Sequence, residues 1–442
     1  MVLGITVAYP TARLLVSSLL DWDTGALRER AAAAALRNTL LMGLASVASA
    51  GALGTALAFA VARFEFPGRG ALSALAYLPY ALPPLVGTLS FYYLIGTDGF
   101  LPRALHALTG GEEVSFSGPV AVLLIHTYSF YVFFYSMVSA ALAGMDVSQL
   151  EAARTLGAGR FRAFRLVTLP MLTPALLGAA LLTFMTSGAS FSAPLYFGND
   201  FPYLSVEIYK AHERFDESRA LTLTIVLACI SLLGVAIFRS RRAPATGGIK
   251  GAPRPLRSQG GRLIAGAAAW AFVALLLVPH FVIAYLSLVD HHQWFTEVFP
   301  TKLTLDNYLT IFRDPAAFKP IRNSLWISVV AALVTLFVGL QTGYLIGRRR
   351  PFAKWVNVLV MVPWALPGTV IAVNLITAFN DRWLPLYNTV FILPLAYFVR
   401  NIPLLTRMST ASIAQFDASL IDAARAHGAS PWYCLRRVIL PL

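Results

Sequence analysis

The feature that most constrains this chain is a series of long apolar runs. Several exceed the roughly 18 apolar residues that a helix needs to cross a lipid bilayer. Inside lipid every backbone N–H and C=O must find a partner within the protein, and a continuous helix provides one. The runs therefore predict an all-α polytopic membrane protein with ten spans, near residues 3–19, 39–62, 71–95, 119–142, 171–197, 219–238, 263–288, 323–346, 356–379 and 389–408.

Composition agrees with membrane helices and excludes a soluble fold. Hydrophobic residues make up 57% of the chain and charged residues only 13%, whereas soluble domains carry about 25% charged residues. The net charge of +14 suggests a nucleic-acid partner, but the basic residues lie in short segments between spans, as membrane orientation requires. Two cysteines, Cys229 and Cys434, are too few for a disulfide framework, and we expect free thiols.

The segments between the spans alternate in charge. One set holds slightly more acidic than basic residues. The other set holds many more basic than acidic residues and comprises 63–70, 143–170, 239–262, 347–355 and 409–442. By the positive-inside rule the basic set is cytoplasmic. This predicts a cytoplasmic amino terminus for a protein of the bacterial inner membrane.

A polar pattern occurs twice, each time after an apolar span. The first copy runs from Asp146 to Leu169-Pro170, and the second runs from Asp417 to Leu440-Pro441. Two shorter stretches are repeated in the same order: 37–40 resembles 322–325, and 78–83 resembles 362–367. Repeats at this scale indicate duplicated structural units, which are common in transporters. Since both copies have the same predicted orientation, we expect two parallel six-helix repeats.

The repeats set the expected domain boundaries. The first domain covers residues 1–238 with spans one to six, and the second covers 263–442 with spans seven to ten. The segment 239–262 between them has seven basic residues and no acidic residue, with several Gly and Pro, which favours a flexible cytoplasmic linker. Two spans follow the first motif but none follows the second. We therefore expect the second repeat to be truncated here, with two further spans in the natural protein.

The repeated motif predicts a short helix that ends in a sharp turn. Asp146 is placed to cap the helix, with Gln149 three residues on as in a capping box. Leu150, Ala153 and Leu156 share one helical face. Gly157 is placed to end the helix in a left-handed turn. The Leu-Pro pair then opens the next span, because proline is tolerated in a first helical turn.

The motif resembles the signature of permease subunits of binding-protein-dependent ABC importers, and the chain resembles two fused permease domains with the type I importer fold. The ferric-iron type is the most similar, with thiamine, polyamine and phosphonate permeases as near relatives. The resemblance implies that each loop forms a coupling helix docked on one of two ATP-binding cassette ATPase subunits, while a soluble substrate-binding protein docks on the outer side. The coupling residues implied are Glu151, Ala152, Ala153, Gly157, Leu169, Pro170, Asp422, Ala423, Ala424, Gly428, Leu440 and Pro441.

The sequence offers no machinery for bond chemistry. No Gly-x-x-x-x-Gly-Lys-[Ser/Thr] loop occurs, so ATP hydrolysis is expected in separate subunits and the chain is not an enzyme. We expect no metal site and no cofactor: His291-His292 is the one histidine pair, and His126 is expected to bond a neighbouring helix. Two alternatives remain open: an ion-coupled secondary transporter, which would need more charged residues deep in the spans, and a membrane-embedded enzyme.

Four features indicate where a solute crosses. Residues 186–199 place hydroxyls, glycine and proline inside a span, which allows close helix packing or an unwound stretch along a cavity. Proline-flanked stretches at corresponding positions predict kinks in the third and ninth spans. Arg400 would meet an anionic group or a helix carboxyl end, or snorkel to the interface, and Asn374 would bond another helix. The predicted path residues are Ser190, Ser192, Pro83, Pro367, Asn374 and Arg400.

Overall fold

The computed structural model describes almost the whole chain, and nearly all of it is helical. The described residues are 1–111, 116–145, 147–238, 254–255, 259–294, 297, 300–380, 384–415, 419–434 and 436–437. They form two compact units: one joins Met1–Asp21 to Ala316–Leu442, and the other is Trp22–Pro315. The structure agrees with the all-α polytopic fold expected from the sequence.

The larger unit, Trp22–Pro315, contains a bundle of long helices with short helices at both ends. Its elements are α2 (Thr24–Arg28), α3 (Arg30–Arg63), β1 (Phe64–Glu65), α4 (Arg69–Leu75), α5 (Leu78–Ala81), α6 (Pro84–Ile95), α7 (Phe100–Thr109), α8 (Gly118–Ala143), α9 (Val147–Thr155), α10 (Arg160–Ala163), the π-helix η2 (Phe164–Thr168), α11 (Leu169–Gly188), α12 (Ser192–Phe197), α13 (Leu204–Glu213), α14 (Glu217–Ile237), β2 (Arg254–Pro255), α15 (Gln259–Ser287), the 3-10 turn η3 (His291–Gln293) and α16 (Asp306–Arg313).

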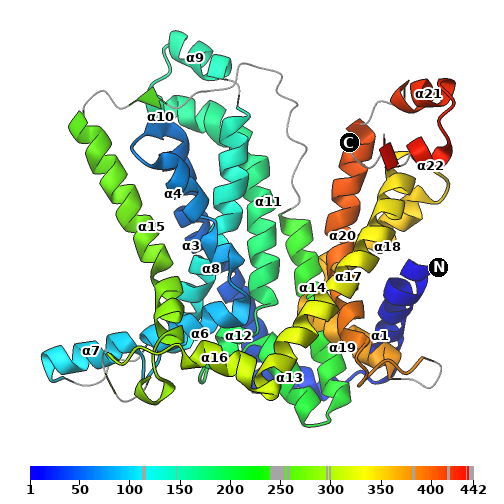
Figure 1. The fold of residues 1–442 in the computed structure, drawn as a ribbon, viewed down its shortest axis with the longest axis horizontal. Coiled ribbons are helices and arrows are strands. Elements are labelled where there is room, and N and C mark those ends of the chain that lie inside the picture. The colour runs from blue at the N-terminus through cyan, green and yellow to red at the C-terminus, as the bar shows by residue number, and fades with distance from the viewer. Residues whose placement is uncertain are drawn as a thin grey trace. The chain divides into compact units, whose positions relative to one another are not determined.

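In this bundle α3, α8 and α11 run side by side (Figure 1). Gly54 of α3 allows the closest approach, since a Cβ there would stand 2.2 Å from the carbonyl oxygen of Tyr131 on α8. Small residues of this kind let membrane helices pack backbone to backbone. The buried tyrosines have hydrogen-bond partners: Tyr131 donates to the carbonyl of Ala76 at 2.6 Å and Tyr203 to that of Ser187 at 2.8 Å.

The other unit contains helices from both ends of the sequence. Its elements are the π-helix η1 (Gly4–Ala8), α1 (Tyr9–Leu20), α17 (Pro315–Gly347), α18 (Ala353–Ala365), α19 (Gly368–Phe379), α20 (Ile392–Gln415), α21 (Ser419–Ala426) and α22 (Pro431–Cys434). α17 and α20 pack through small residues, with Thr342 and Thr406 hydrogen-bonded across them at 2.8 Å.

Packing does not follow the order of the sequence repeat. α1 packs against α19, although it begins the first predicted repeat, and α15 packs against α4, α5 and α6, although it begins the second. The boundaries at residues 238 and 263 describe duplication in the sequence and stay a prediction. Most of the predicted linker, 239–253 and 256–258, lies outside the described residues.

Among the described residues, six helices are long and apolar enough to cross a membrane, and up to eight spans result if each bent pair counts as one. The two bent pairs are α4–α5 with α6–α7, at 98°, and α18 with α19, at 114°. The residue before a proline is pushed out of the helical region, and Leu82 and Leu366 are extended before Pro83 and Pro367. The predicted kinks are thus confirmed.

Ten spans were expected, and two of them fall short of this criterion. The helix over residues 4–20 is apolar but too short. α20 covers the expected tenth span and carries Arg400 and Arg407, which lower its hydropathy.

Candidate functional site

The first repeated loop forms the short helix that the sequence predicted. α9 ends in a Schellman turn: the Gly157 N–H donates to the Arg154 carbonyl at 2.9 Å, and the Ala158 N–H donates to the Ala153 carbonyl at 3.0 Å. Gly157 takes the left-handed conformation this turn needs, with φ of 83°. The predicted cap, Asp146, lies outside the described residues.

The second loop repeats this geometry. Gly428, 271 positions later (428 minus 157), has φ of 82° and donates to the Arg425 carbonyl at 2.9 Å. The Ala429 N–H donates to the Ala424 carbonyl at 3.0 Å. Both helices therefore end by the same hydrogen bonds. Asp417, Leu440 and Pro441 lie outside the described residues, as does the side chain of Asp422.

Two details of the predicted first loop are wrong. Leu156 does not share a helical face with Leu150, because it follows the last residue of α9; Leu150 is buried, whereas Leu156 is 88% exposed. Leu169-Pro170 does not open the next span either, because one helical segment runs from Arg160 to Gly188. The π-helix η2 precedes Leu169 and changes the hydrogen-bond spacing where Pro170 lacks an N–H.

Exposed apolar side chains border both loops. The sequence analysis did not predict them. Phe161 is 76% exposed, and Trp432, at the matching position of the second loop (161 plus 271), is 68% exposed. Ala152 and Ala423 also match and are both exposed. Aromatic side chains are enriched in protein interfaces, so both positions are candidates for contact with a partner protein. The repeat itself was the available signal, since both positions carry an aromatic residue.

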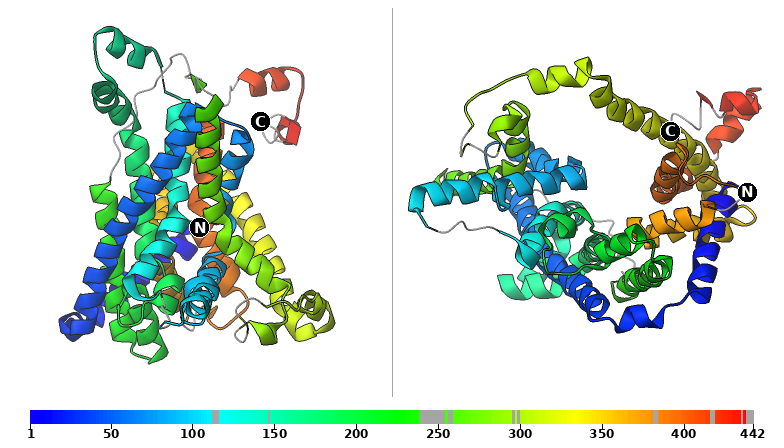
Figure 2. Two further views of the ribbon diagram at one scale, coloured as in Figure 1. Left: turned by 90° about the vertical axis from the view of Figure 1, so that its left-hand side faces the viewer. Right: turned by 90° about the horizontal axis from the view of Figure 1, so that it is seen from below.

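In the larger unit α9 lies at one end of the bundle, and α7 and α16 lie at the other (Figures 1 and 2). The bundle between them contains four of the helices long enough to cross a membrane, besides α15. The first loop therefore lies on the opposite membrane face from α7 and α16.

The helix between the predicted path residues Ser190 and Ser192 is interrupted. α11 ends at Gly188 and α12 begins at Ser192. The carbonyl of Ser190 accepts a hydrogen bond from the Ser205 hydroxyl, which satisfies a group that the interruption leaves free. Ser190 and Ser192 are both half-buried. This is the unwound stretch that the hydroxyl- and proline-containing sequence allowed.

A buried polar cluster lies next to this interruption. His126 Nδ1 is hydrogen-bonded to the hydroxyls of Ser46 and Ser187, at 3.1 Å each. The two serine hydroxyls lie 3.2 Å apart. The cluster joins α3, α8 and α11, so the prediction that His126 bonds a neighbouring helix is confirmed. The cluster is also connected to Tyr203, whose hydroxyl donates a hydrogen bond to the Ser187 carbonyl.

The second helix break has a charged partner. Arg400 Nη1 of α20 donates to the carbonyl of Leu366 at 3.2 Å, and Leu366 is the last residue before the break between α18 and α19. Of the three predicted roles for Arg400, the structure shows the contact with a helix carboxyl end. A cation there matches the negative end of the helix dipole.

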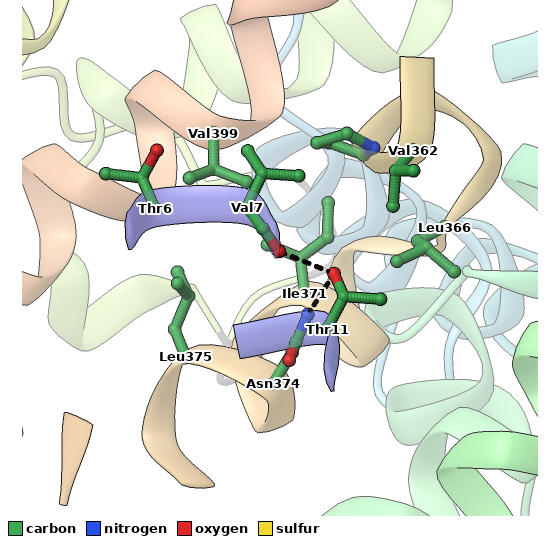
Figure 3. Close-up of a pocket in the computed structure, with 10 residues that line it drawn as sticks. Thr6, Val7, Thr11, Val362, Leu366, Ile371, Asn374, Leu375 and Val399 are labelled. Atoms are coloured by element: carbon green, nitrogen blue, oxygen red, sulfur yellow. Dashed lines mark hydrogen bonds between the residues drawn. The ribbon is translucent and has the colours of Figure 1, made fainter. Parts of the chain in front are cut away.

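Asn374 bonds another helix, as expected. Its Nδ2 donates to the Thr11 hydroxyl of α1 at 3.4 Å (Figure 3). The side chain borders a cavity of about 10 Å³ and its Oδ1 has no protein partner. A space of this size holds about one water molecule, so it is far too small to bind a transported solute.

The acidic residues after α12 have local partners. Glu207 pairs with Lys210 at 3.1 Å and with Arg219 at 3.7 Å, and Arg219 also reaches Glu29 at 2.7 Å. Glu213 accepts from the Tyr209 hydroxyl. Asp216 caps α14 by accepting from the Arg219 N–H at 3.1 Å. Of these carboxylates, Glu207 joins α13 to Arg219 of α14, and the others bond within or at the end of one helix.

A helical bundle with proline-broken apolar helices and two loops of the same geometry is typical of the membrane subunit of a transporter. The chain belongs to the family of binding-protein-dependent transport system inner membrane components, whose pattern matches residues 52–240 and 336–442. The resemblance found in the repeated motif is thus confirmed.

Individual relatives agree on permease function and differ in substrate. The chain is 30% identical to the "Probable ABC transporter permease protein y4fN" of Sinorhizobium fredii, over 94% of this chain and 75% of that protein. It is 25% identical to the ferric transport system permease protein FbpB of Actinobacillus pleuropneumoniae, over 99% of this chain and 66% of that one. It is 33% identical to the molybdenum transport system permease protein ModB of Escherichia coli K12, over 41% of this chain and 81% of that one.

Proposed function

We propose that this permease couples to two ATPase subunits through α9 and α21. The observation that carries the proposal is the matching pair of Schellman turns, which present two helices with the same ending at positions related by the sequence repeat. Glu151, Ala152 and Ala153 with Gly157 form the first docking element. Asp422, Ala423 and Ala424 with Gly428 form the second. Leu169-Pro170 lies within the helical segment Arg160–Gly188 that follows the first element, and the second copy of the motif ends in Leu440-Pro441.

The small and apolar side chains give each docking element its shape. Ala152 and Ala423 leave a shallow surface that a groove can approach closely. Phe161 and Trp432 then supply the large apolar contacts that dominate many protein interfaces. ATP binding in the partner subunits pulls the two elements together, and the attached helices move with them. ATP hydrolysis in those subunits resets the permease.

The solute path follows the interrupted helices. Ser190 and Ser192 lie at one interruption, and Pro83 and Pro367 lie at the two bends. Broken helices in corresponding positions of two repeats commonly line transport paths, because their free backbone groups need a polar surrounding. Arg400 and Asn374 hold the helices around the second bend. Two repeats, 1–238 and 263–442, would enclose the path.

The loops face the cytoplasm in this proposal, with the amino terminus on the same side, since basic segments favour that orientation. A soluble binding protein would deliver the solute to the opposite face. Ferric iron is the proposed cargo. Similarity to a ferric permease extends over 99% of the chain, whereas similarity to a molybdenum permease covers 41%.

The docking proposal is tested by ATPase-subunit binding to the permease in lipid nanodiscs. Glu151→Arg with Asp422→Arg should abolish binding, because both reverse a charge inside the docking elements. Glu217→Arg is the matched control, since this exposed carboxylate lies on α14, outside both loops. Equal binding by the double variant and the control would reject α9 and α21 as the docking elements.

The cargo is tested by uptake of radioactive ferric iron into proteoliposomes that contain the permease and its ATPase. Candidate binding proteins are loaded and added one at a time, with molybdate, polyamine, thiamine and phosphonate as rivals. Uptake of iron alone supports the proposal, and uptake of a rival replaces it. Transport that continues without any ATPase subunit would favour an ion-coupled secondary transporter.

A further inference from the structure

α16 carries an exposed apolar stripe that has no role in the proposed importer cycle. Leu305, at the start of the helix, is 64% exposed and Phe312 is 78% exposed. Tyr308 and Leu309 lie between them and are also exposed. These four residues have the i, i+3, i+4, i+7 spacing of one helical face. No residue of α16 is buried, so its unit does not cover the apolar side chains of the stripe.

The position of α16 is fixed by hydrogen bonds to the end of α15. Asn307 Nδ2 donates to the carbonyl of Ser287 at 3.0 Å and to that of Val289 at 2.8 Å. The hydroxyls of Tyr308 and Ser287 lie 2.7 Å apart. Ser287 is the last residue of α15, one of the helices long enough to cross the membrane. α16 is therefore held at the level where this span leaves the bilayer (Figures 1 and 2).

A small hairpin strengthens this placement. Val289 pairs with Leu303 in an antiparallel bridge, and the Thr304 N–H donates to the Leu288 carbonyl at 2.7 Å. Lys302 pairs with Asp290 at 3.0 Å. α16 follows the hairpin directly, so both its beginning and its side chain Asn307 are tied to the end of the span.

We propose that α16 lies along the membrane boundary, with its apolar stripe in the lipid acyl chains. Short amphipathic helices lie in the interface in this way. The occupant is lipid because Tyr308 of the stripe contacts Ser287 at the end of the membrane-spanning helix α15. The apolar side chains Phe281 on α15 and Leu288 just after it are also exposed. The far side of α16 carries Asp306, Thr310 and Arg313, which suits water and headgroups.

The tyrosine supports this orientation. Tyr308 has its ring exposed and its hydroxyl bonded to Ser287. Tyrosine is enriched at membrane boundaries, where its ring meets lipid and its hydroxyl meets polar groups. In this arrangement α16 holds the end of α15 at a fixed depth. The inference depends on the membrane span α15 and not on the proposed coupling or cargo.

The test places an environment-sensitive fluorophore on single cysteines in the full chain. Cys229→Ala and Cys434→Ala remove the native thiols, and Phe312→Cys or Leu309→Cys carries the probe on the stripe. Thr310→Cys is the matched control, since this exposed residue lies on the opposite face of the same helix. In nanodiscs with brominated phospholipids we expect quenching at 312 and 309 at least threefold stronger than at 310, with bluer emission.

Equal quenching at all three sites would overturn the proposal, as would none at 309 and 312. The alternative occupant, a soluble binding protein, is tested in the same samples without brominated lipid. If emission at 312 changes only when that protein is added, the stripe is a protein docking surface and the lipid assignment is wrong. The readout needs no transport, so failure of the importer proposal would leave it unaffected.

Discussion

Replacing Gly157 with alanine isolates the left-handed turn from every other property of the first docking element. No atom lies within 4 Å of the place where a Cβ would stand, so the substitution costs only backbone conformation. At φ of 83° an L-residue costs about 1–2 kcal/mol. At 1.4 kcal/mol for each tenfold change, the correctly ended helix loses about 5- to 30-fold in relative population.

The assay is the affinity of the ATPase subunit for the permease in nanodiscs, measured by surface plasmon resonance. Gly157→Ala should weaken binding within that range. Gly157→Asn should weaken it less, because asparagine enters the left-handed region more readily. Gly144→Ala is the control: it lies just before the loop and has φ of −87°, and the nearest atom to its added Cβ is the Ala140 carbonyl oxygen at 3.5 Å, an ordinary contact. If Gly157→Ala and Gly144→Ala bind equally well, the turn does not govern docking.

Three further predictions concern stability. Gly54→Ala should lower the melting temperature in detergent by several degrees through its clash with the Tyr131 carbonyl, while Gly87→Ala, which meets no atom within 4 Å, should not. Arg400→Met should remove the bond to Leu366 and destabilise the permease by about 1 kcal/mol, with Arg400→Lys intermediate, in denaturant titration. Lys302 hydrogen-bonds Asp290, which lowers the Asp290 pKa below 3.8. The hairpin should therefore lose protection from hydrogen exchange as the pH falls below 3.8 and through the lowered Asp290 pKa. Lys302→Met should weaken this dependence, since the His292 N–H still hydrogen-bonds Asp290.

Each of these has a result that contradicts it. Equal melting of Gly54→Ala and Gly87→Ala would mean that α3 and α8 do not pack as closely as described. Unchanged unfolding of Arg400→Met would remove the helix-end role of Arg400. Hairpin protection that does not fall at any acidic pH before the whole permease unfolds, or that falls equally in Lys302→Met, would show that the Asp290 pair does not order this segment.

Local features were predictable from the sequence because they depend on neighbouring residues. Prolines at 83 and 367 bend their helices since the residue before each proline cannot stay helical. Gly157 ends α9 because few other residues adopt positive φ. The long apolar runs became helices for the same kind of reason, since lipid leaves the backbone no alternative.

Features that depend on distant partners were not predictable. Glu207 pairs with Lys210 on its own helix α13 and with Arg219 on α14, and the second pair exists only once the two helices pack. Arg400 had three plausible roles, and only folding brings it to Leu366. The spacing correctly placed Leu150 in a short helix. It could not fix the end of that helix to one residue, and Leu156 lies past this end.

The packing of α1 against α19 has a consequence for synthesis in the cell. α1 ends at Leu20, whereas α19 begins at Gly368. Translation must therefore add some 350 residues before α19, the helix against which α1 packs, begins to exist. At about 5–20 residues per second this takes roughly 20 to 70 seconds. During that interval the Thr11 hydroxyl keeps its bond to the Val7 carbonyl but lacks the hydrogen bond that it accepts from Asn374. The first helix of this chain must therefore wait in the bilayer without its neighbour, which makes the order of membrane insertion, and any insertase that shelters an early helix, part of how this permease matures.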